Sequence, residues 1–168
     1  MDFKLLSAGH GYKEVLSNLL QFYMYDFSEY TDCDVEANGL FGAYPGLDYY
    51  WEEADHKFPY LLQKDGTPIG FVLVRFIQTA ACDYFSIAEF FIMKKYRRAG
   101  IGKAAAKQVF DLHRGQWEVH QKKNNLPARA FWRTVIDEYT QGLFTERLEN
   151  KKAIQDFENQ PGLHHSKK

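Results

Sequence analysis

Hydrophobic residues along the chain follow two different spacings. Over residues 13–25 they recur every three or four positions, which predicts an amphipathic helix. Residues 58–64 and 69–76 form short apolar runs instead, and the Asp65-Gly66 pair between them is typical of a two-residue hairpin turn. The second run is almost continuously apolar, which is typical of a central strand covered on both faces. These segments predict a helix followed by a β-hairpin.

The rest of the chain continues to alternate between strands and helices. Residues 32–46 carry Asn-Gly, Phe-Gly and Pro-Gly pairs, which are typical of a loop. The other predicted elements are a strand at 3–7, a short helix at 47–55, a strand at 87–93, a helix beginning near 101, a strand at 117–120, a helix after Pro127, and strands at 140–148 and 153–157. The resulting order, β-α-α-β-β-β-α-β-α-β-β, indicates a mixed α/β fold.

The turn between the strand at 87–93 and the next helix has the features of an anion-binding site. A basic segment, residues 94–98, leads to Gly100 and Gly102. Glycines let the backbone approach an anion closely, and the start of the following helix adds a partial positive charge. Arg97, Arg98 and Lys103 add full positive charges. The pattern predicts that this turn, called the glycine turn below, binds phosphate.

The glycine turn does not fit the phosphate-binding loop of nucleoside triphosphatases. That motif requires glycine at position 97 and serine or threonine at position 104, where this chain has Arg97 and Ala104. A tight turn whose glycines serve only packing stays open as an interpretation, because short glycine patterns are common.

The dinucleotide-binding fingerprint fits the glycines better. Gly100, Gly102 and Ala105 match its G-x-G-x-x-A spacing. That motif also needs an acidic residue about 20 positions further on, at the end of the next strand, where it binds a ribose. His120 and Gln121 stand there instead, so the match is incomplete.

Two motifs taken together give a more specific match. The segment Arg97-x-x-Gly100-x-Gly102 resembles the Q/R-x-x-G-x-G/A signature of the GNAT (Gcn5-related N-acetyltransferase) superfamily, and the strand before it also fits the pattern of that family. Further on, Asn125-x-x-Ala128-x-x-Phe131-Trp132 is similar to the family's N-x-x-A-x-x-hydrophobe-Tyr segment. The matched stretch extends from Glu89 to Trp132, and the order of elements around it agrees with the family.

The resemblance implies a fold and a cosubstrate. The fold is α/β, with a single mixed, mostly antiparallel sheet flanked by helices, and we expect it to occupy residues 1–158. Residues 159–168 contain Pro161-Gly162 and a polar end, and we expect a disordered tail there. The cosubstrate is acetyl-CoA (coenzyme A), and the implied activity is transfer of its acetyl group to an amine.

The family also indicates which residues contact the cofactor. The pantetheine arm pairs with backbone groups of the strand before the glycine turn, and the pyrophosphate lies on the amides of the turn. Asn125 is a further contact, although asparagine also caps helices and occupies loops without any ligand. The expected cofactor-binding residues are Phe91, Ile92, Met93, Arg97, Arg98, Ala99, Gly100, Ile101, Gly102, Lys103 and Asn125.

Glu89 is the one acid inside its apolar strand, and it is the candidate catalytic residue. Burial would raise the pKa of its carboxyl and make it a usable general base, directly or through a water. The alternative is a carboxylate at the rim of the sheet, solvated or paired with an arginine.

Trp132 departs from the family, which commonly has a tyrosine there whose hydroxyl protonates the leaving thiolate. An indole N–H donates a hydrogen bond but is not a practical acid. The group that protonates the thiolate is therefore left unassigned.

The segment 23–55 combines acids and aromatics with no Lys or Arg. In the family this region covers the acceptor site. Acidic side chains attract a cationic amine, and aromatic faces suit ammonium groups. A solvated acidic surface over an aromatic core is the alternative. A polyamine, an aminoglycoside-like amine, an amino-acid derivative and a peptide amine all stay open as acceptors.

Composition narrows the remaining possibilities. At 168 residues the chain suits one domain, and 45% hydrophobic residues are enough for a core of that size. The formal net charge of −1 favours neither nucleic acid nor an anionic membrane as a partner. No apolar run approaches the roughly 18 residues of a membrane helix, and the start does not resemble a signal peptide. The two cysteines lack a CxxC spacing, which fits free thiols in a reducing compartment. We therefore expect a cytoplasmic protein.

Other chemistries are poorly supported. The six histidines show no metal-ligand spacing with cysteines or acids, so no metal is expected, and no G-x-S-x-G segment presents a serine nucleophile. A local basic patch would suit RNA, but the phosphates of coenzyme A account for it with fewer assumptions. The patch consists of Lys94, Lys95, Arg97, Arg98, Lys103 and Lys107.

Together these observations predict an acetyl-CoA-dependent N-acetyltransferase that acts on a small, cationic primary amine by direct attack on the thioester. A non-catalytic CoA-binding or protein-interaction module of the same fold is the alternative, and a nucleic-acid-binding domain is a third interpretation. The oligomeric state is open, a homodimer included.

Overall fold

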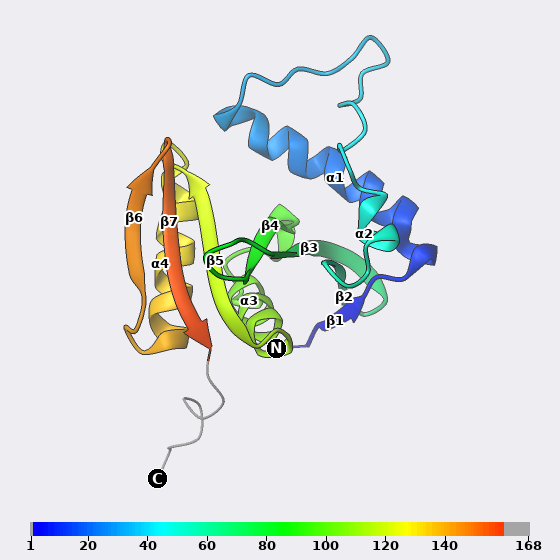
Figure 1. The fold of residues 1–168 in the computed structure, drawn as a ribbon. Coiled ribbons are helices and arrows are strands. Elements are labelled where there is room, and N and C mark those ends of the chain that lie inside the picture. The colour runs from blue at the N-terminus through cyan, green and yellow to red at the C-terminus, as the bar shows by residue number, and fades with distance from the viewer. Residues whose placement is uncertain (1, 160–168) are drawn as a thin grey trace. The chain divides into compact units, whose positions relative to one another are not determined.

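In the computed structural model, which describes residues 2–159, the elements follow the predicted order (Figure 1). The helices are α1 (Lys13–Phe27), α2 (Tyr49–Glu52), α3 (Ile101–Leu112) and α4 (Leu126–Thr140). The strands are β1 (Lys4–Ser7), β2 (Lys57–Lys64), β3 (Thr67–Ile77), β4 (Tyr84–Ile92), β5 (Gly115–Lys122), β6 (Thr145–Glu149) and β7 (Lys152–Asn159). These strands form one sheet in the order β1-β2-β3-β4-β5-β7-β6.

The sheet is mixed and mostly antiparallel, which confirms the predicted fold class. The pairs β1–β2, β2–β3, β5–β7 and β6–β7 are antiparallel, and β4 pairs with β5 in parallel at Phe85 and Trp117. The chain forms two compact units. The first unit holds the residues up to Arg75 together with Ala88–Ile101, and the second holds Phe76–Ile87 and the residues from Gly102 on.

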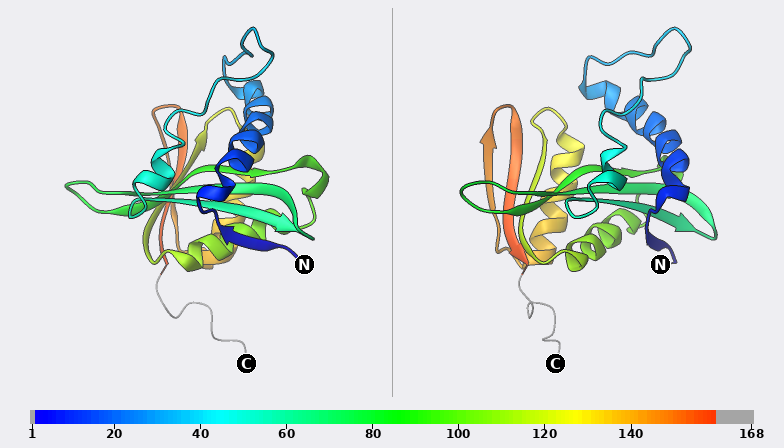
Figure 2. Two further views of the ribbon diagram at one scale, coloured as in Figure 1. Left: turned by 90° about the vertical axis from the view of Figure 1, so that its right-hand side faces the viewer. Right: turned by 45° about the vertical axis from the view of Figure 1, so that its right-hand side comes forward.

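In the first unit, α1 and α2 lie against the same face of β2 and β3 (Figure 2). The apolar stripe of α1 turns toward these strands, as its three- and four-residue spacing predicts. Burial of a leucine-sized side chain contributes about 1.5–3 kcal/mol, so this interface is a major source of the unit's stability. Its buried side chains include Leu16, Leu19 and Leu20 of α1, Leu61 of β2, Phe71 and Leu73 of β3, and Phe91 of β4.

The predicted hairpin turn joins β2 to β3. Asp65 and Gly66 both have positive φ, 50° and 77°, which matches the twist of the flanking strands. β2 and β3 then pair from Lys64–Thr67 to Lys57–Arg75. This register puts Arg75 on the same face as Leu73, since residues two apart in a strand share a face.

In the second unit, an aromatic core lies between α3, α4 and the strands β5 and β7. The ring centroid of Phe110, from α3, lies 4.8 Å from that of Trp117, 5.1 Å from that of Tyr139 and 5.0 Å from that of Phe157. Trp117 and Phe157 face each other across β5 and β7 with nearly parallel rings. Large aromatic side chains therefore fill the interior of this unit.

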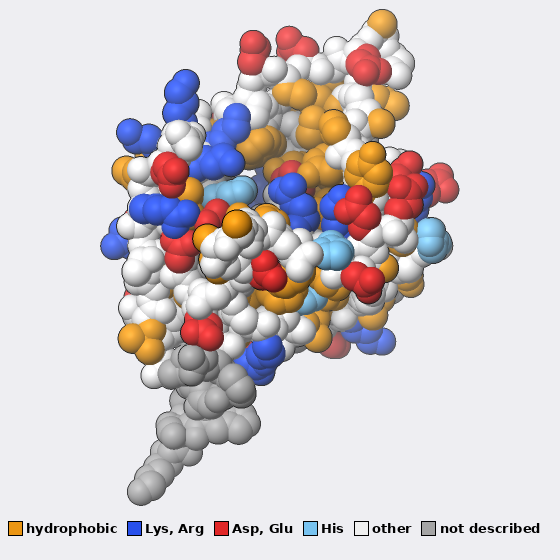
Figure 3. Space-filling model, viewed as in Figure 1, with side chains coloured by type: hydrophobic (Ala, Val, Ile, Leu, Met, Phe, Trp, Pro, Cys, Tyr) orange, Lys and Arg blue, Asp and Glu red, His pale blue; other side chains and the backbone are white. Residues whose placement is uncertain are grey.

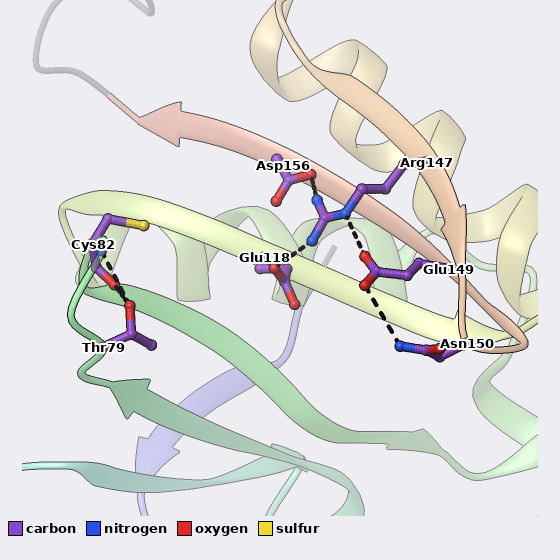
Figure 4. Close-up of polar contacts among 7 residues, drawn as sticks. All are labelled: Thr79, Cys82, Glu118, Arg147, Glu149, Asn150 and Asp156. Atoms are coloured by element: carbon purple, nitrogen blue, oxygen red, sulfur yellow. Dashed lines mark hydrogen bonds and ion pairs between the residues drawn. The ribbon is translucent and has the colours of Figure 1, made fainter.

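An ion-pair network covers the outer surface of β5, β7 and β6. Arg147 of β6 pairs with Asp156 of β7, with Glu118 of β5 at 2.9 Å and with Glu149 at 3.2 Å (Figure 4). Solvent screens these partly exposed charges, so we expect the network to contribute more to strand placement than to stability.

The structure differs from the predicted elements in two places. The strand predicted at 140–148 begins only at Thr145, because α4 continues to Thr140 and ends where Gln141 adopts a left-handed conformation with φ 56°. Thr140 is buried, so tertiary packing keeps within the helix a residue type that favours strands. The helix predicted at 47–55 is reduced to the single turn of α2.

At the other end of the described chain, β7 includes Asn159. The side chain of Asn159 is buried, accepts a hydrogen bond from the Gly115 amide at 2.7 Å and donates to the His113 carbonyl at 2.8 Å. The strand therefore reaches the first residue of the predicted tail, and the rest of that tail lies outside the described residues.

β3 and β4 approach each other closely at Gly70. A Cβ atom at this position would lie 2.2 Å from the carbonyl oxygen of Phe91 and 3.1 Å from Cα of Ile92. Beside this contact, the Met93 amide donates to the Ile69 carbonyl at 2.9 Å. Only glycine fits here without a shift of the backbone.

We expect Gly70→Ala to lower the melting temperature, because the added methyl group would displace the backbone of β4. Overpacking of this kind costs about 1–3 kcal/mol, which corresponds to roughly 2–12 °C in a protein of this size. Gly9→Ala is the matched control, since Gly9 has an ordinary φ of −63° and an added Cβ there meets nothing within 4 Å. Thermal unfolding followed by circular dichroism measures the difference, and equal melting temperatures would contradict the predicted clash.

Candidate functional site

Glu89 lies in β4 on the face that α1 covers, two residues from Phe91 of the same core. Two tyrosine hydroxyls donate to its carboxylate, one from Tyr23 of α1 and one from Tyr44 in the loop before α2, the latter at 2.7 Å. The ring of Tyr23 in turn contacts Phe71 and Phe91, with centroid distances of 5.9 and 6.3 Å. The candidate catalytic acid is thus held by two side chains that lie far from it in the sequence.

The surroundings of Glu89 act on its pKa in two directions. Burial raises the pKa of the carboxyl, since the charged form loses hydration. The hydrogen bonds from Tyr23 and Tyr44 and the positive charge of Arg75 oppose this effect, and burial prevails. A carboxylate whose pKa is raised is a better proton acceptor near neutral pH than an exposed one.

The two tyrosines stay protonated in this arrangement. Burial and the negative charge of Glu89 raise the pKa of both the Tyr23 and the Tyr44 hydroxyl. Both groups therefore donate to the carboxylate over the whole physiological pH range. Both tyrosines belong to the aromatic segment 23–55, and nothing in their sequence pattern indicated a role at Glu89.

Arg75 and Tyr50 lie close to the same carboxylate, and neither was predicted as a site residue. The charges of Arg75 and Glu89 both act on the pKa of Tyr50, which burial raises. Tyr50 Oη and Arg75 Nε are buried and have no hydrogen-bond partner among the described residues. The sequence feature that could have identified Arg75 is its position: it is a charged residue directly after an apolar run in a predicted central strand.

The glycine turn joins β4 to α3. A short 3-10 turn at Lys94–Tyr96 follows β4, Arg98 and Gly100 have positive φ values of 63° and 77°, and α3 begins at Ile101. The first amides of an α-helix have no intrahelical partner. Those at the start of α3 are therefore suited to an anion.

Two of the three predicted phosphate-binding cations pair with acidic side chains. Arg97 forms an ion pair with Asp26 of α1, and Lys103 pairs with Glu138 of α4 at 2.6 Å. Arg98 has no ion-pair partner within residues 2–159. Among Arg97, Arg98 and Lys103, Arg98 is thus the one whose positive charge can pair with a bound anion.

The end of β4, where the pantetheine contacts are predicted, is partly paired already. The side chains of Phe91 and Ile92 are buried. The Met93 amide donates to the Ile69 carbonyl, and the Ile92 carbonyl accepts from Arg97 Nε at 2.6 Å. The main chain of this segment is therefore rigidly held.

Asn125 and Trp132 have structural roles at the second motif. The side-chain oxygen of Asn125 accepts a hydrogen bond from the Ala128 amide at 3.1 Å and so caps the start of α4. Trp132 is buried in α4, with its ring centroid 6.3 Å from that of Phe110. The cap is the role that sequence analysis left open for Asn125 beside a cofactor contact.

The acidic and aromatic segment 23–55 is divided between core and surface. Tyr23, Tyr44 and Tyr50 are partly or fully buried, whereas Tyr25 and Tyr49 are 67% and 49% exposed. Figure 3 shows acidic and hydrophobic side chains together on the surface of α1 and the loop that follows it. The segment thus combines an acidic surface with aromatic side chains in the core, and its role at an acceptor site stays a prediction.

A groove of about 850 Å³ lies in the first unit, between the start of α1 and the loop before α2. Tyr44, whose hydroxyl holds Glu89, is part of its wall. Glu14, Asp48 and Glu52 also line it, and Lys13 pairs with Asp48 at 2.7 Å. Acids outnumber bases around the groove, which favours a positively charged occupant.

Within residues 2–159, no group of three or more His, Cys, Asp or Glu side chains is placed to hold a metal ion. None of the helices in that range has the length and apolar character needed to cross a membrane. Cys33 and Cys82 are both free thiols.

Comparison with known proteins agrees with this geometry. The model of the acetyltransferase (GNAT) family matches residues 17–135. No curated protein sequence matches the chain. Among solved structures, the PaiA N-acetyltransferase of Thermoplasma acidophilum in complex with coenzyme A has a TM-score of 0.64 and 10% identity, over 95% of this chain and 100% of that one.

Two further structures show the range of acceptors on this fold. Arabidopsis thaliana Naa50 in complex with the bisubstrate analogue CoA-Ac-MVNAL has a TM-score of 0.60 and 15% identity, over 93% of this chain and 97% of that one. The aminoglycoside acetyltransferase HMB0005 from an uncultured soil metagenomic sample has a TM-score of 0.58 and 15% identity, over 80% and 91% of the two chains. At these identities the similarity concerns the fold.

We expect Tyr44→Phe to raise the pKa of the Glu89 carboxyl further, because the variant loses a donor that stabilises the charged form. Tyr49→Phe is the matched control, since this tyrosine is half-exposed and its ring faces Lys57, whose Nζ lies 4.5 Å from the ring centroid. A carbon-13 NMR titration of the glutamate carboxyls measures both. An unchanged or lowered pKa in Tyr44→Phe would show that the hydrogen bond does not stabilise the carboxylate.

Proposed function

Because the chain belongs to the acetyltransferase (GNAT) family, we propose that it transfers the acetyl group of acetyl-CoA to a primary amine, with Glu89 as general base. The observation that carries this proposal is the carboxylate of Glu89, partly buried in β4 and held by two tyrosine hydroxyls. Its raised pKa suits it to take a proton from an ammonium group near neutral pH.

The proposed reaction is a direct attack of the amine on the thioester. Glu89 accepts a proton from the ammonium form of the acceptor, directly or through a water, which frees the nitrogen lone pair. The nitrogen then bonds to the carbonyl carbon, the carbon–sulfur bond breaks, and the sulfur leaves with the electron pair. The nitrogen releases its second proton to water, which leaves a neutral amide. Holding donor and acceptor together supplies much of the rate, because the thioester is already activated.

Protonation of the departing thiolate does not require Trp132. A thiol has a pKa of about 8.5, so a thiolate is a moderate base that water can protonate. We therefore assign this proton to water. The buried indole of Trp132 packs against the ring of Phe110 and serves the core of the second unit.

For the donor, we propose the sites that the family resemblance implies. The backbone from Arg98 to Lys103 would hold the diphosphate, since Gly100 has positive φ and α3 begins directly after it. Arg98 would add a full positive charge. Backbone groups of Phe91 to Met93, in β4, would pair with the pantetheine arm. Asn125 would be a further cofactor contact.

For the acceptor, we propose a small primary amine that arrives as its cationic ammonium form. The acids around the groove would attract it, and Tyr44 lies between that groove and Glu89. Solved relatives of this fold carry a peptide analogue or are named for aminoglycosides, so the fold accepts amines of very different size.

A non-catalytic CoA-binding module is the second candidate. The observation that favours it is the buried tryptophan at position 132, where the family commonly provides a hydroxyl. Such a module would bind the cofactor through the same glycine turn but would release no thiol with any amine.

We expect Glu89→Gln to lower kcat/KM by about 10²- to 10⁴-fold, the usual contribution of a general base. Wild-type activity should fall as the pH drops through the raised pKa of Glu89, because only the ionised carboxylate accepts a proton. The variant should lack this acidic limb. Thiol release over a panel of primary amines measures both effects, with Glu29→Gln as an exposed control from the same unit. Full activity with an unchanged acidic limb would remove Glu89 from this role.

Acetyl-CoA should stabilise the protein by about 2.7 kcal/mol at 100 times its dissociation constant, which raises the melting temperature by roughly 5–11 °C. A thermal shift titration measures this without requiring catalysis. NADH at the same concentration is the control, because the glycine spacing also fits part of the dinucleotide fingerprint. A shift with NADH and none with acetyl-CoA would overturn the assignment of the glycine turn.

A further inference from the structure

Asp26 occupies an unfavourable place for an acid. It lies in the last turn of α1, where the partial negative charge of the helix end repels a carboxylate. That last turn contains no basic residue to offset the charge. Partners from outside the helix must therefore stabilise Asp26.

Both partners come from the glycine turn. Arg97 forms an ion pair with one carboxylate oxygen of Asp26, and Lys94 Nζ lies 3.2 Å from the other. The Asp26 side chain is only 21% exposed, whereas that of Lys94 is 72% exposed. Arg97 is thus the better-shielded partner of the two.

Arg97 is held on its other sides as well. Its Nε donates to the Ile92 carbonyl at 2.6 Å, and its guanidinium lies 5.6 Å from the ring centroid of Phe91. Three contacts therefore fix this side chain between the end of β4 and the end of α1. A guanidinium committed in this way would have to break its ion pair with Asp26 in order to bind a phosphate.

The backbone of the glycine turn starts from this fixed point. Arg97 is extended, with φ −73° and ψ 162°, and Arg98 and Gly100 then take positive φ before α3 begins. The direction of the amides from residue 98 on depends on where Arg97 is held. Amides that bind an anion must converge on it, so a small shift at Arg97 would spoil their alignment.

α1 also positions the candidate base. Tyr23, which donates to Glu89, precedes Asp26 by three residues, and residues three apart lie on the same face of a helix. One rigid helix therefore contacts both the carboxylate of Glu89 and the start of the glycine turn.

We propose that Asp26 is a positioning residue for the donor: its ion pair with Arg97 holds the glycine turn so that the backbone amides bind the diphosphate of acetyl-CoA. This inference rests on the proposed function. It assigns the side chain of Arg97 to the support of the turn, and not to the phosphates themselves.

The opposite role for Arg97 makes an opposite prediction. If Asp26 merely holds a guanidinium that later moves to the diphosphate, the carboxylate competes with the cofactor. Removing its charge would then tighten cofactor binding. The direction of the change in affinity therefore distinguishes the two roles.

The test compares Asp26→Asn with the wild type for two acetyl donors, acetyl-CoA and S-acetylpantetheine, which lacks the diphosphate. We expect Asp26→Asn to raise KM for acetyl-CoA and Kd for coenzyme A by about tenfold, equivalent to 1.4 kcal/mol. The value of kcat, and kcat/KM for S-acetylpantetheine, should stay at the wild-type level. Asp32→Asn, an exposed acid of the same unit, is the matched control.

Three results would overturn the proposal: an unchanged Kd for coenzyme A, a lowered one, or an equal loss with both donors. An equal loss with both donors would mean that the substitution disturbs the fold in general. Asp26→Glu checks this, because a carboxylate one methylene longer should restore part of the affinity for coenzyme A. Calorimetric binding of coenzyme A keeps this test independent of catalysis. If the wild type binds coenzyme A but acetylates no amine, the proposed function fails while the role of Asp26 is still decided.

Discussion

A carboxylate inside an apolar strand is the constraint on which much of the first unit depends. Burying an unpaired charge costs several kcal/mol, so Glu89 is tolerated only with partners. Tyr23 and Tyr44 supply two hydroxyl donors, one from α1 and one from the loop before α2. Satisfying the carboxylate therefore fixes that loop against β4. One of these two partners, Tyr44, also forms part of the wall of the acidic groove.

The glycine turn carries less free positive charge than its sequence suggests. Asp26 pairs with Lys94 and Arg97, and Glu138 pairs with Lys103 and Lys107. What this leaves for an anion is the backbone of the turn and the start of a helix, together with the side chain of Arg98. Backbone amides act at short range, so we expect such a site to suit a compact anion.

The order of elements and the glycine turn were predictable, because both follow from local spacing and from residue types with strong backbone preferences. The strand predicted at 140–148 begins only at Thr145, because the buried Thr140 still belongs to α4 and Gln141 then turns the chain in a left-handed conformation. At the site, Glu89 stood out as a lone acid in an apolar run. Tyr23, Tyr44 and Arg75 could not be recognised in the same way. They come close to Glu89 only through strand register and a loop that folds back over β4. The ion pair between Arg97 and Asp26 also joins residues far apart in the sequence, so it could not be predicted either.

The ionic network of β6 has a consequence beyond its own unit. β6 is the last strand of the sheet, and all of its residues are exposed. An open edge of this kind is a template on which a foreign strand can add, the first step toward fibrous aggregates. Arg147 and Glu149 lie on that edge strand, and Asp156 and Glu118 lie on the two strands next to it. An added strand would have to displace the water around these charges before it could hydrogen-bond, so they oppose the joining of two sheets edge to edge.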